Sequence, residues 1–184
     1  MGLARTDSRL VLNLGSGRKQ ISGAVNVDWN PEVKPQIILD LNSIPWPFSN
    51  HTFDEIVAFD VIEHLDNIVF TMDEIYRVSR DGAKIRITVP HFSCANTFTD
   101  PTHQHQFGWL SFHFFTGESD TPLSAQSKFK RLQTRINFYP SLMNKLIWRM
   151  ANRWPEAYEK RWTWMFPAWF LYVELQTVKP QSSG

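Results

Sequence analysis

The chain has 184 residues, of which 42% are hydrophobic and 20% are charged, and its formal net charge is +1. This length can bury one sizeable core, and the composition excludes a disordered chain. A charge so close to zero gives no electrostatic reason for binding nucleic acid, so we expect no nucleic-acid partner. The single cysteine, Cys94, excludes an internal disulfide and favours a reducing, cytoplasmic setting.

The sequence predicts neither a signal peptide nor a membrane span. Its first nine residues are polar, and no later run approaches the roughly 18 unbroken apolar residues that a span needs. We therefore expect no stable membrane insertion. Aromatic residues reach 14%, and most of the tryptophans lie in the second half. The composition changes near residue 90 without a linker, which predicts one domain over 1–184 with a different role for each half, 1–90 and 91–184.

Five short apolar or alternating runs predict strands in the first half. They span Leu10–Leu14, Ala24–Asp28, Gln36–Leu41, Phe53–Phe59 and Lys84–Val89. Only nine residues separate the first run from the second, whereas a parallel crossover normally takes a dozen or more. The first crossover helix is therefore expected to be short or missing.

The best helix candidate is Asp66–Ser79, with Asp66 as its expected N-cap. Two late strands are predicted at Arg131–Tyr139 and Ala168–Val178, with a helix at Ser141–Arg153 between them. This order of elements predicts an α/β fold: a Rossmann-like, mostly parallel sheet that ends in a late antiparallel strand pair.

In such sheets, ligands bind beyond the carboxyl ends of the strands. Glycines 15 and 17, after the first strand, would let a ligand approach the backbone, since no Cβ blocks it. Asp28 could accept hydrogen bonds from ribose hydroxyls, and Asp40 from an adenine amine. A third glycine is absent, which favours an adenosyl group without a pyrophosphate. The alternatives are an ordinary tight turn and solvated strand ends.

Several blocks carry a resemblance to a known family. They are LNLGSG at 12–17, NVD at 26–28, the segments 40–65 and 74–91, and DPTH at 100–103. Over residues 9–115 the chain resembles the methyltransferase type 11 group of class I S-adenosylmethionine-dependent methyltransferases, in particular its compact bacterial members. One departure is Asn13, which stands where the family usually has an acid.

The resemblance implies a Rossmann-like class I methyltransferase fold and S-adenosyl-L-methionine as cofactor. Residues 1–90 would then form the cofactor-binding half, and 91–184 an aromatic-rich substrate and lid half. The cofactor-binding residues that it implies follow the first four strands. They are Leu14, Gly15, Ser16, Gly17, Asp28, Trp29, Asp40, Leu41, Phe59 and Asp60.

Four histidines, at 91, 103, 105 and 113, fall within 23 residues. An imidazole titrates near neutral pH and can take a proton from an attacking hydroxyl, so we expect a catalytic base here, His103 first and His91 second. Alternatively, these histidines hold a loop in place. The spacing matches no strong zinc pattern, so we expect no metal site. Glu63 and His64 could pair with each other, bind the backbone or serve the site.

The expected function is S-adenosylmethionine-dependent methyl transfer to a small-molecule or glycan acceptor, at oxygen. The alternative is a module that binds S-adenosylmethionine without turnover and acts as a partner or sensor. The basic and aromatic segment Leu142–Phe170 is expected to form a lid and core over the sheet, with a membrane-surface or ring-stacking role as the alternative. The oligomeric state is not predicted.

Overall fold

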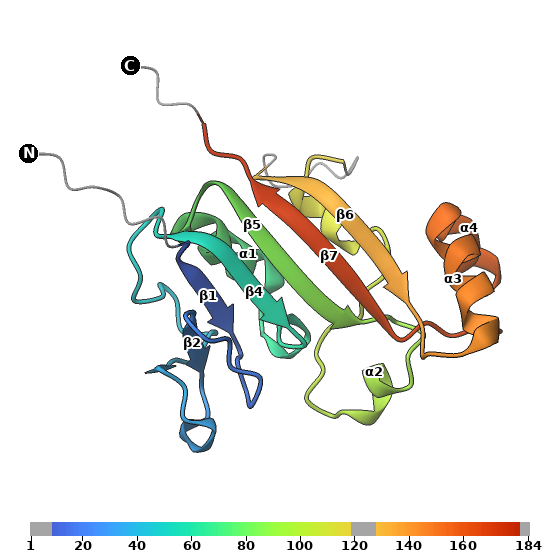
Figure 1. Cartoon of the computed structure of the whole chain (residues 1–184), viewed down its shortest axis with the longest axis horizontal. Helices are drawn as coiled ribbons and strands as arrows, with labels where there is room; N and C mark the ends of the chain where they lie inside the picture. The colour runs from blue at the N-terminus through green and yellow to red at the C-terminus, as the bar shows by residue number, and fades with distance from the viewer. Residues whose placement is uncertain (1–8, 119–127, 181–184) are drawn as a thin grey trace, which may run out of the picture.

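The computed structural model describes residues 9–118 and 128–180. Within these residues seven strands form one sheet in the order β3-β2-β1-β4-β5-β7-β6 (Figure 1). Their bounds are β1 Val11–Leu14, β2 Val25–Asp28, β3 Ile37–Ile38, β4 Phe53–Phe59, β5 Ser79–Pro90, β6 Phe129–Asn137 and β7 Phe170–Thr177. Strands β1 to β5 pair in parallel, and β7 runs antiparallel to β5 and β6. The predicted fold class is confirmed.

The helices are few and short. The α-helices are α1 Ile68–Val78, α2 Asn96–Thr99, α3 Leu142–Arg153 and α4 Pro155–Arg161, and the 3₁₀ helices are η1 Pro31–Val33, η2 Ile62–His64 and η3 Ser111–Phe115. No helix lies between β1 and β2, as the short crossover predicted. Among the described residues, no helix is both long and apolar enough to cross a membrane.

Alternation along β5 separates a core face from a charged face. Ile85, Ile87 and Val89 are fully buried and belong to the same hydrophobic core as Met72 and Ile75 of α1, the helix that covers this part of the sheet (Figure 1). The intervening side chains are half-buried and form ion pairs across the other face, Lys84 with Glu174 and Arg86 with Glu55. Strand β5 therefore contributes an apolar face to the core and a charged face to the other side of the sheet.

Helix α1 begins one residue later than predicted. The side chain of Asn67, not Asp66, accepts a hydrogen bond from the backbone N–H of Phe70 at 3.1 Å. Asp66 instead accepts from the side chain of Gln104 at 2.9 Å. The predicted cap was therefore wrong, because a contact between distant segments takes the Asp66 carboxylate.

Two strands, β3 and β5, differ most in length from the prediction. β3 pairs with β2 over two residues only, and the chain then enters the loop that contains Pro45. β5 begins at Ser79, immediately after α1, five residues before the predicted start. The Ser79 hydroxyl lies 2.8 Å from that of Thr177 in a buried hydrogen bond, which ties this early segment to β7.

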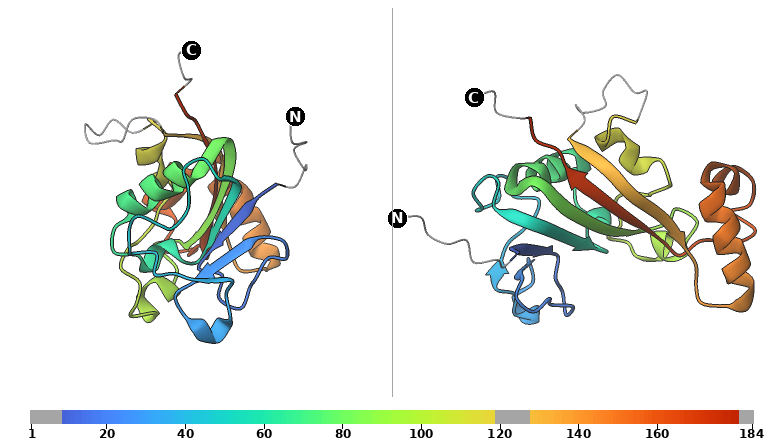
Figure 2. Two further views of the ribbon diagram at one scale, coloured as in Figure 1. Left: turned by 90° about the vertical axis from the view of Figure 1, so that its left-hand side faces the viewer. Right: turned by 45° about the horizontal axis from the view of Figure 1, so that its top comes forward.

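Helices α3 and α4 extend beyond the end of β6 and β7 (Figure 2). Ile147, Ala151 and Tyr158 are buried there, but Leu142 is 86% exposed and Leu146 72%. The expected lid and core is therefore present only in part, because the apolar residues of the first turns of α3 do not pack on the sheet.

Candidate functional site

The carboxyl ends of β1, β2 and β4 lie side by side at one edge of the sheet, because these strands are parallel neighbours. The register places Leu14 beside Val27 and Ala58. The residues that follow these strands, Gly15, Asp28 and Asp60, therefore converge on one region. Leu14 itself is fully buried and supports this edge from the core.

The loop after β1 turns through two glycines. Gly15 and Gly17 have φ angles of +56° and +46°, in the left-handed region that disfavours side chains. A Cβ on Gly15 would lie 2.4 Å from Val61, whereas one on Gly17 would meet nothing within 4 Å. Between them, the Ser16 hydroxyl is buried and has no hydrogen-bond partner within the described part of the chain. The loop thus exposes open backbone beside an unsatisfied polar atom.

Asp28 ends β2 with a buried carboxylate. Its two oxygens accept from the backbone N–H groups of Gly17 at 2.7 Å and Asn30 at 2.9 Å. A carboxylate oxygen has two acceptor positions, so each oxygen can accept one further hydrogen bond. The ring of the next residue, Trp29, is 73% exposed and available to pack on a planar ligand.

Asp40 and Leu41 follow β3. Asp40 is exposed, and one of its oxygens accepts from the backbone N–H of Asn42 at 2.9 Å. Leu41 is buried, and its carbonyl accepts from the indole of Trp46 at 3.1 Å. The Asp40 carboxylate is therefore accessible to a ligand amine, whereas the Leu41 side chain belongs to the buried core behind Asp40.

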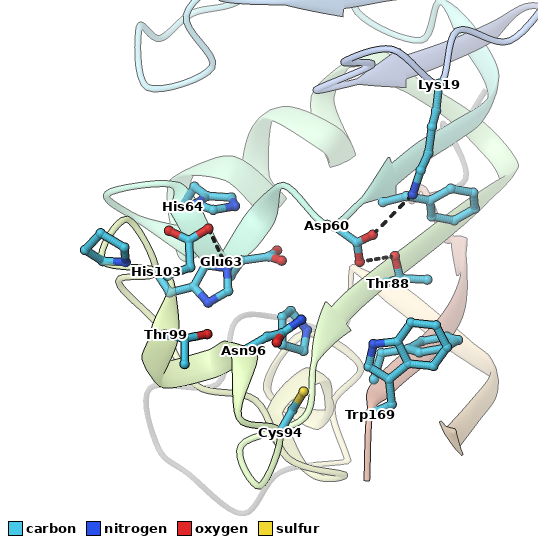
Figure 3. A pocket seen from close by; sticks show the side chains of 15 residues that line it. Lys19, Asp60, Glu63, His64, Thr88, Cys94, Asn96, Thr99, His103 and Trp169 are labelled. Atoms are coloured by element: carbon cyan, nitrogen blue, oxygen red, sulfur yellow. Dashed lines mark hydrogen bonds and ion pairs between the residues drawn. The ribbon is translucent and has the colours of Figure 1, made fainter. Parts of the chain in front are cut away.

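A cavity of about 900 Å³ lies beside this edge (Figure 3). Phe59 and Asp60, two of the expected site residues, line it at the end of β4. Its remaining lining residues are Lys19, Glu63, His64, Thr88, Pro90, Cys94, Asn96, Thr99, Asp100, Pro101, His103, Trp169 and Phe170. The cavity thus joins the loop after β1 to the segment that follows β5.

Asp60 has a φ of +55°, a strained conformation for a residue with a side chain. Its backbone N–H donates to the carbonyl of Thr88 at 3.0 Å, and its carboxylate accepts from the Thr88 hydroxyl at 2.9 Å. Lys19 lies 3.8 Å from the other carboxylate oxygen (Figure 3). These contacts hold the carboxylate at the cavity rim, between the loop after β1 and strand β5.

Glu63 lies in η2, and its carboxylate points into the cavity (Figure 3). The residue is 1% exposed, and neither carboxylate oxygen has a hydrogen-bond partner among the described residues. Burial raises the pKa of Glu63 to about 8, and the negative charges of Asp60 and Asp100 add to this effect. The sequence left the role of Glu63 open, because its burial depends on the segment 100–104, which is distant in the chain.

His64 and His103 approach each other although 39 positions separate them in the chain; their ring centroids are 4.7 Å apart. The loop is held by Gln104, whose N–H donates to the Glu63 carbonyl at 2.8 Å and whose side chain donates to the His64 carbonyl at 3.0 Å. His103 Nδ1 is buried and has no hydrogen-bond partner in residues 9–118 and 128–180, and Nε2 lies 3.9 Å from Asp100.

The other histidines of the predicted group lie elsewhere. His91 is fully buried; its ring nitrogens contact Ser93 at 2.8 Å and Glu159 at 3.1 Å, and it does not line the cavity. His105 Nε2 donates to the Leu65 carbonyl at 2.8 Å. The structure therefore brings His103 to the site, but it does not bring His91 there.

Some cavity residues were not anticipated, chiefly Lys19, Thr88 and Trp169. The missing crossover helix could have predicted that Lys19 lines the cavity, because without this helix the loop after β1 stays close to the cavity. Trp169 stacks on Tyr139 with ring centroids 4.4 Å apart, a pairing between residues 30 positions apart. No local pattern in the sequence shows that contact.

The residues at the strand ends fit the cofactor that the sequence suggested. Glycine backbone, the unpartnered Ser16 hydroxyl and the free acceptor positions of Asp28 suit the polar groups of S-adenosylmethionine. Asn13 is an exception, because its amide already donates to Asn26 at 2.8 Å and to the carbonyl of Lys19 at 3.2 Å. The side-chain N–H groups of Asn13 are therefore not available to the carboxylate at the amino-acid end of the cofactor.

Comparison with known proteins supports this fit. A family model described as a methyltransferase domain matches residues 18–87. A S-adenosylmethionine-dependent methyltransferase from Archaeoglobus fulgidus has a similar structure, with a TM-score of 0.67 and 17% identity over 93% of this chain and 87% of that one. A S-adenosylmethionine-dependent methyltransferase from Mesorhizobium loti is similar with a TM-score of 0.58 and 12% identity, over 91% and 90%.

The same fold also occurs in a [4+2]-cyclase, SpnF, with a TM-score of 0.58 and 16% identity over 94% of this chain and 75% of that one. No curated protein matches the sequence. At these identities the structural likeness shows the fold, while the family model connects the sequence itself to methyltransferases. Family model, strand order and site residues agree: the chain has the fold of class I S-adenosylmethionine-dependent methyltransferases, and its residues 18–87 match a methyltransferase domain.

Proposed function

We propose that this chain is a S-adenosylmethionine-dependent methyltransferase and that it acts on a hydroxyl oxygen of a small-molecule or glycan-type acceptor, which binds in the cavity. One observation carries the proposal. Two of the residues expected to bind the cofactor, Phe59 and Asp60, line the cavity together with His103, whose ring Nδ1 has no hydrogen-bond partner among the described residues. A hydroxyl must lose its proton as it is methylated, so acceptor groups of this kind favour an oxygen target.

Lys19 and Asp60 are proposed to receive the amino-acid end of the cofactor. That end carries an ammonium and a carboxylate, and Asp60 and Lys19 present the complementary pair of charges 3.8 Å apart at the rim. Both side chains are exposed, so neither is committed to the core. This pair supplies the contact that Asn13, already hydrogen-bonded within the protein, does not make.

His103 is proposed as the residue through which the acceptor loses its proton. S-adenosylmethionine supplies an electrophilic methyl group on a positively charged sulfur. With the cofactor bound, the acceptor oxygen would form a bond to the methyl carbon as the carbon–sulfur bond breaks, and His103 would take the hydroxyl proton. The buried position of His103 Nδ1 favours alignment in a site with little water.

The aromatic wall of the cavity supports a ring-shaped acceptor. Trp169 is held by stacking on Tyr139 and by an edge contact to Phe170, with ring centroids 5.1 Å apart. Phe59 and Phe170 line the same cavity. A wall of apolar rings with a few polar groups is typical of sites that orient a small ligand, and a sugar has both apolar and hydroxyl-bearing faces.

The test is transfer of an isotope-labelled methyl group from S-adenosylmethionine to a panel of sugars, glycans and cell extracts. His103→Ala should lower transfer by about 10²–10⁴-fold with little change in cofactor affinity by calorimetry. His105→Ala is the control, because His105 lies two residues away but outside the cavity. Binding of S-adenosylhomocysteine without methylation of any acceptor would instead support a binding module.

A further inference from the structure

The geometry points to a divalent transition-metal site, which we propose takes Zn²⁺, formed by Glu63, His64 and His103. Each residue offers one ligand atom, and these atoms lie within 4.8 Å of one another. Ligands of a single tetrahedral zinc ion lie about 3.3 Å apart, so closing the site takes side-chain movements on the order of 1 Å. The proposed role of the ion in methyl transfer rests on the proposed function. The proposal that these residues bind a metal ion does not.

Glu63 is the strongest sign of a missing positive charge. Its carboxylate is buried, faces the cluster and has no hydrogen-bond partner among the described residues. The carboxylates of Asp60 and Asp100 add negative charge nearby. A buried carboxylate without a partner is costly, and a bound cation would remove this cost.

The protonation of His64 suits a metal ligand. The Thr102 hydroxyl donates its one proton to Asp100 at 2.6 Å, so its oxygen, 2.8 Å from His64 Nδ1, acts there as an acceptor. Nδ1 therefore carries the proton of a neutral His64, and the lone pair lies on Nε2. Metal-binding histidines are oriented in this way, by an outer group that accepts from the nitrogen opposite the metal.

His103 completes the set from the other side. One ring nitrogen, Nδ1, is buried without a partner, and the other lies 3.9 Å from the Asp100 carboxylate. Asp100 also receives the Thr102 hydroxyl, so a single carboxylate organises the surroundings of both histidines.

Two histidines and one carboxylate form a set that Zn²⁺ and Fe²⁺ use when a coordination position stays open for a substrate. Here the open side would face the cavity, where the acceptor is proposed to bind. An ion at this place would bind the acceptor hydroxyl and lower its pKa. His103 would then act as a ligand, and the hydroxyl proton would leave to solvent.

The binding test needs no acceptor. Metal-stripped full-length protein is titrated with ZnCl₂ by calorimetry, and with CoCl₂ while visible absorption is recorded. We expect one equivalent to bind, and His64→Ala and Glu63→Gln each to weaken binding by about 100-fold or more. Thr102→Val should weaken it by about 10–100-fold, because it removes the group that orients His64. His105→Ala should bind as the wild type does.

The outcomes separate this proposal from the proposed function. Zn²⁺ binding that is absent, or equally strong in His64→Ala, would overturn the metal site even if Glu63→Gln fails to fold. Methyl transfer that stops on chelation and returns with Zn²⁺ supports the catalytic role. Metal binding without any methylated acceptor supports the site and contradicts the proposed function, whereas transfer by metal-free protein leaves His103 as a simple base and overturns the role of the ion.

Discussion

Gly15 and Gly17 share a left-handed backbone but differ in their surroundings. A Cβ at Gly15 would meet Val61 at 2.4 Å, whereas at Gly17 the space is open. A side chain would therefore strain the left-handed backbone at both positions, but it would overlap a neighbouring residue only at Gly15. The difference shows that Gly15 fixes the distance between the loop and the segment after β4, while Gly17 leaves room for a ligand.

This contrast predicts unequal costs for the same substitution. Gly17→Ala should destabilise the protein by about 1–2 kcal/mol, the cost of a left-handed conformation with a side chain. Gly15→Ala should cost about 1–3 kcal/mol more, because the new methyl group overlaps Val61. Guanidinium unfolding measures both. In a Val61→Ala background the Gly15 substitution should become less costly; an unchanged cost would show that Val61 is not the obstacle.

The carboxylate of Asp28 is expected to hold the ribose of the cofactor. Asp28→Ala removes that acceptor and leaves the N–H groups of Gly17 and Asn30 without their partner. Binding of S-adenosylhomocysteine should weaken by about 1–3 kcal/mol. Calorimetry gives the affinity, with the exposed Glu32→Ala as control. Full affinity in a folded Asp28→Ala protein would place the adenosine elsewhere.

At the level of single elements, the start of α1 gives a direct test. Asn67→Ala removes the cap on Phe70 and should lower stability by about 0.5–2 kcal/mol. Asp66→Ala leaves the cap in place and removes only the contact to Gln104, so its effect on thermal unfolding should be smaller. A larger loss of stability from Asp66→Ala than from Asn67→Ala would indicate that Asp66 is the N-cap, as the sequence alone suggested.

The strands of the sheet could be predicted from the sequence because their signals are local. Buried parallel strands appear as short apolar runs that end at glycine or an acid, and Val11–Leu14 and Phe53–Phe59 follow this rule. The late strands were also predictable from alternation. The early start of β5 was not, since Ser79–Gly82 carries no apolar signal and is ordered by pairing with Phe53 and Thr177.

The candidate site was predictable only on the side of the cofactor. Glycines and acids that directly follow strands can be recognised in the sequence. The structure places these residues together at one edge of the sheet. The Glu63–His64–His103 cluster depends on Gln104, which ties the loop after β5 to η2 through two hydrogen bonds. Such contacts between distant segments leave no periodic pattern. For the same reason the sequence ranked His103 before His91 as the base but did not show that His91 lies outside the cavity.

For the whole molecule, stability should depend on pH through His113. Burial, together with the positive charge of Arg131, lowers the pKa of His113 below its ordinary value of 6.5 in the folded protein, against opposing effects of Glu118 and Glu156. The unfolded chain therefore takes up a proton near pH 6.5 that the folded protein does not. As the pH falls through this value, unfolding is favoured and stability is lost.

The measurement is thermal unfolding at several pH values between 7.5 and 5.5 for the wild type and His113→Gln, at constant ionic strength. The wild type should lose more stability across this range than the variant, and the difference between the two removes contributions from all other groups. Glu118 titrates below the range, because its hydrogen bond to Arg131 lowers its pKa. Parallel pH profiles for the two proteins would show that His113 is protonated equally in the folded and unfolded states, and would contradict the assignment of its buried ring as a neutral group.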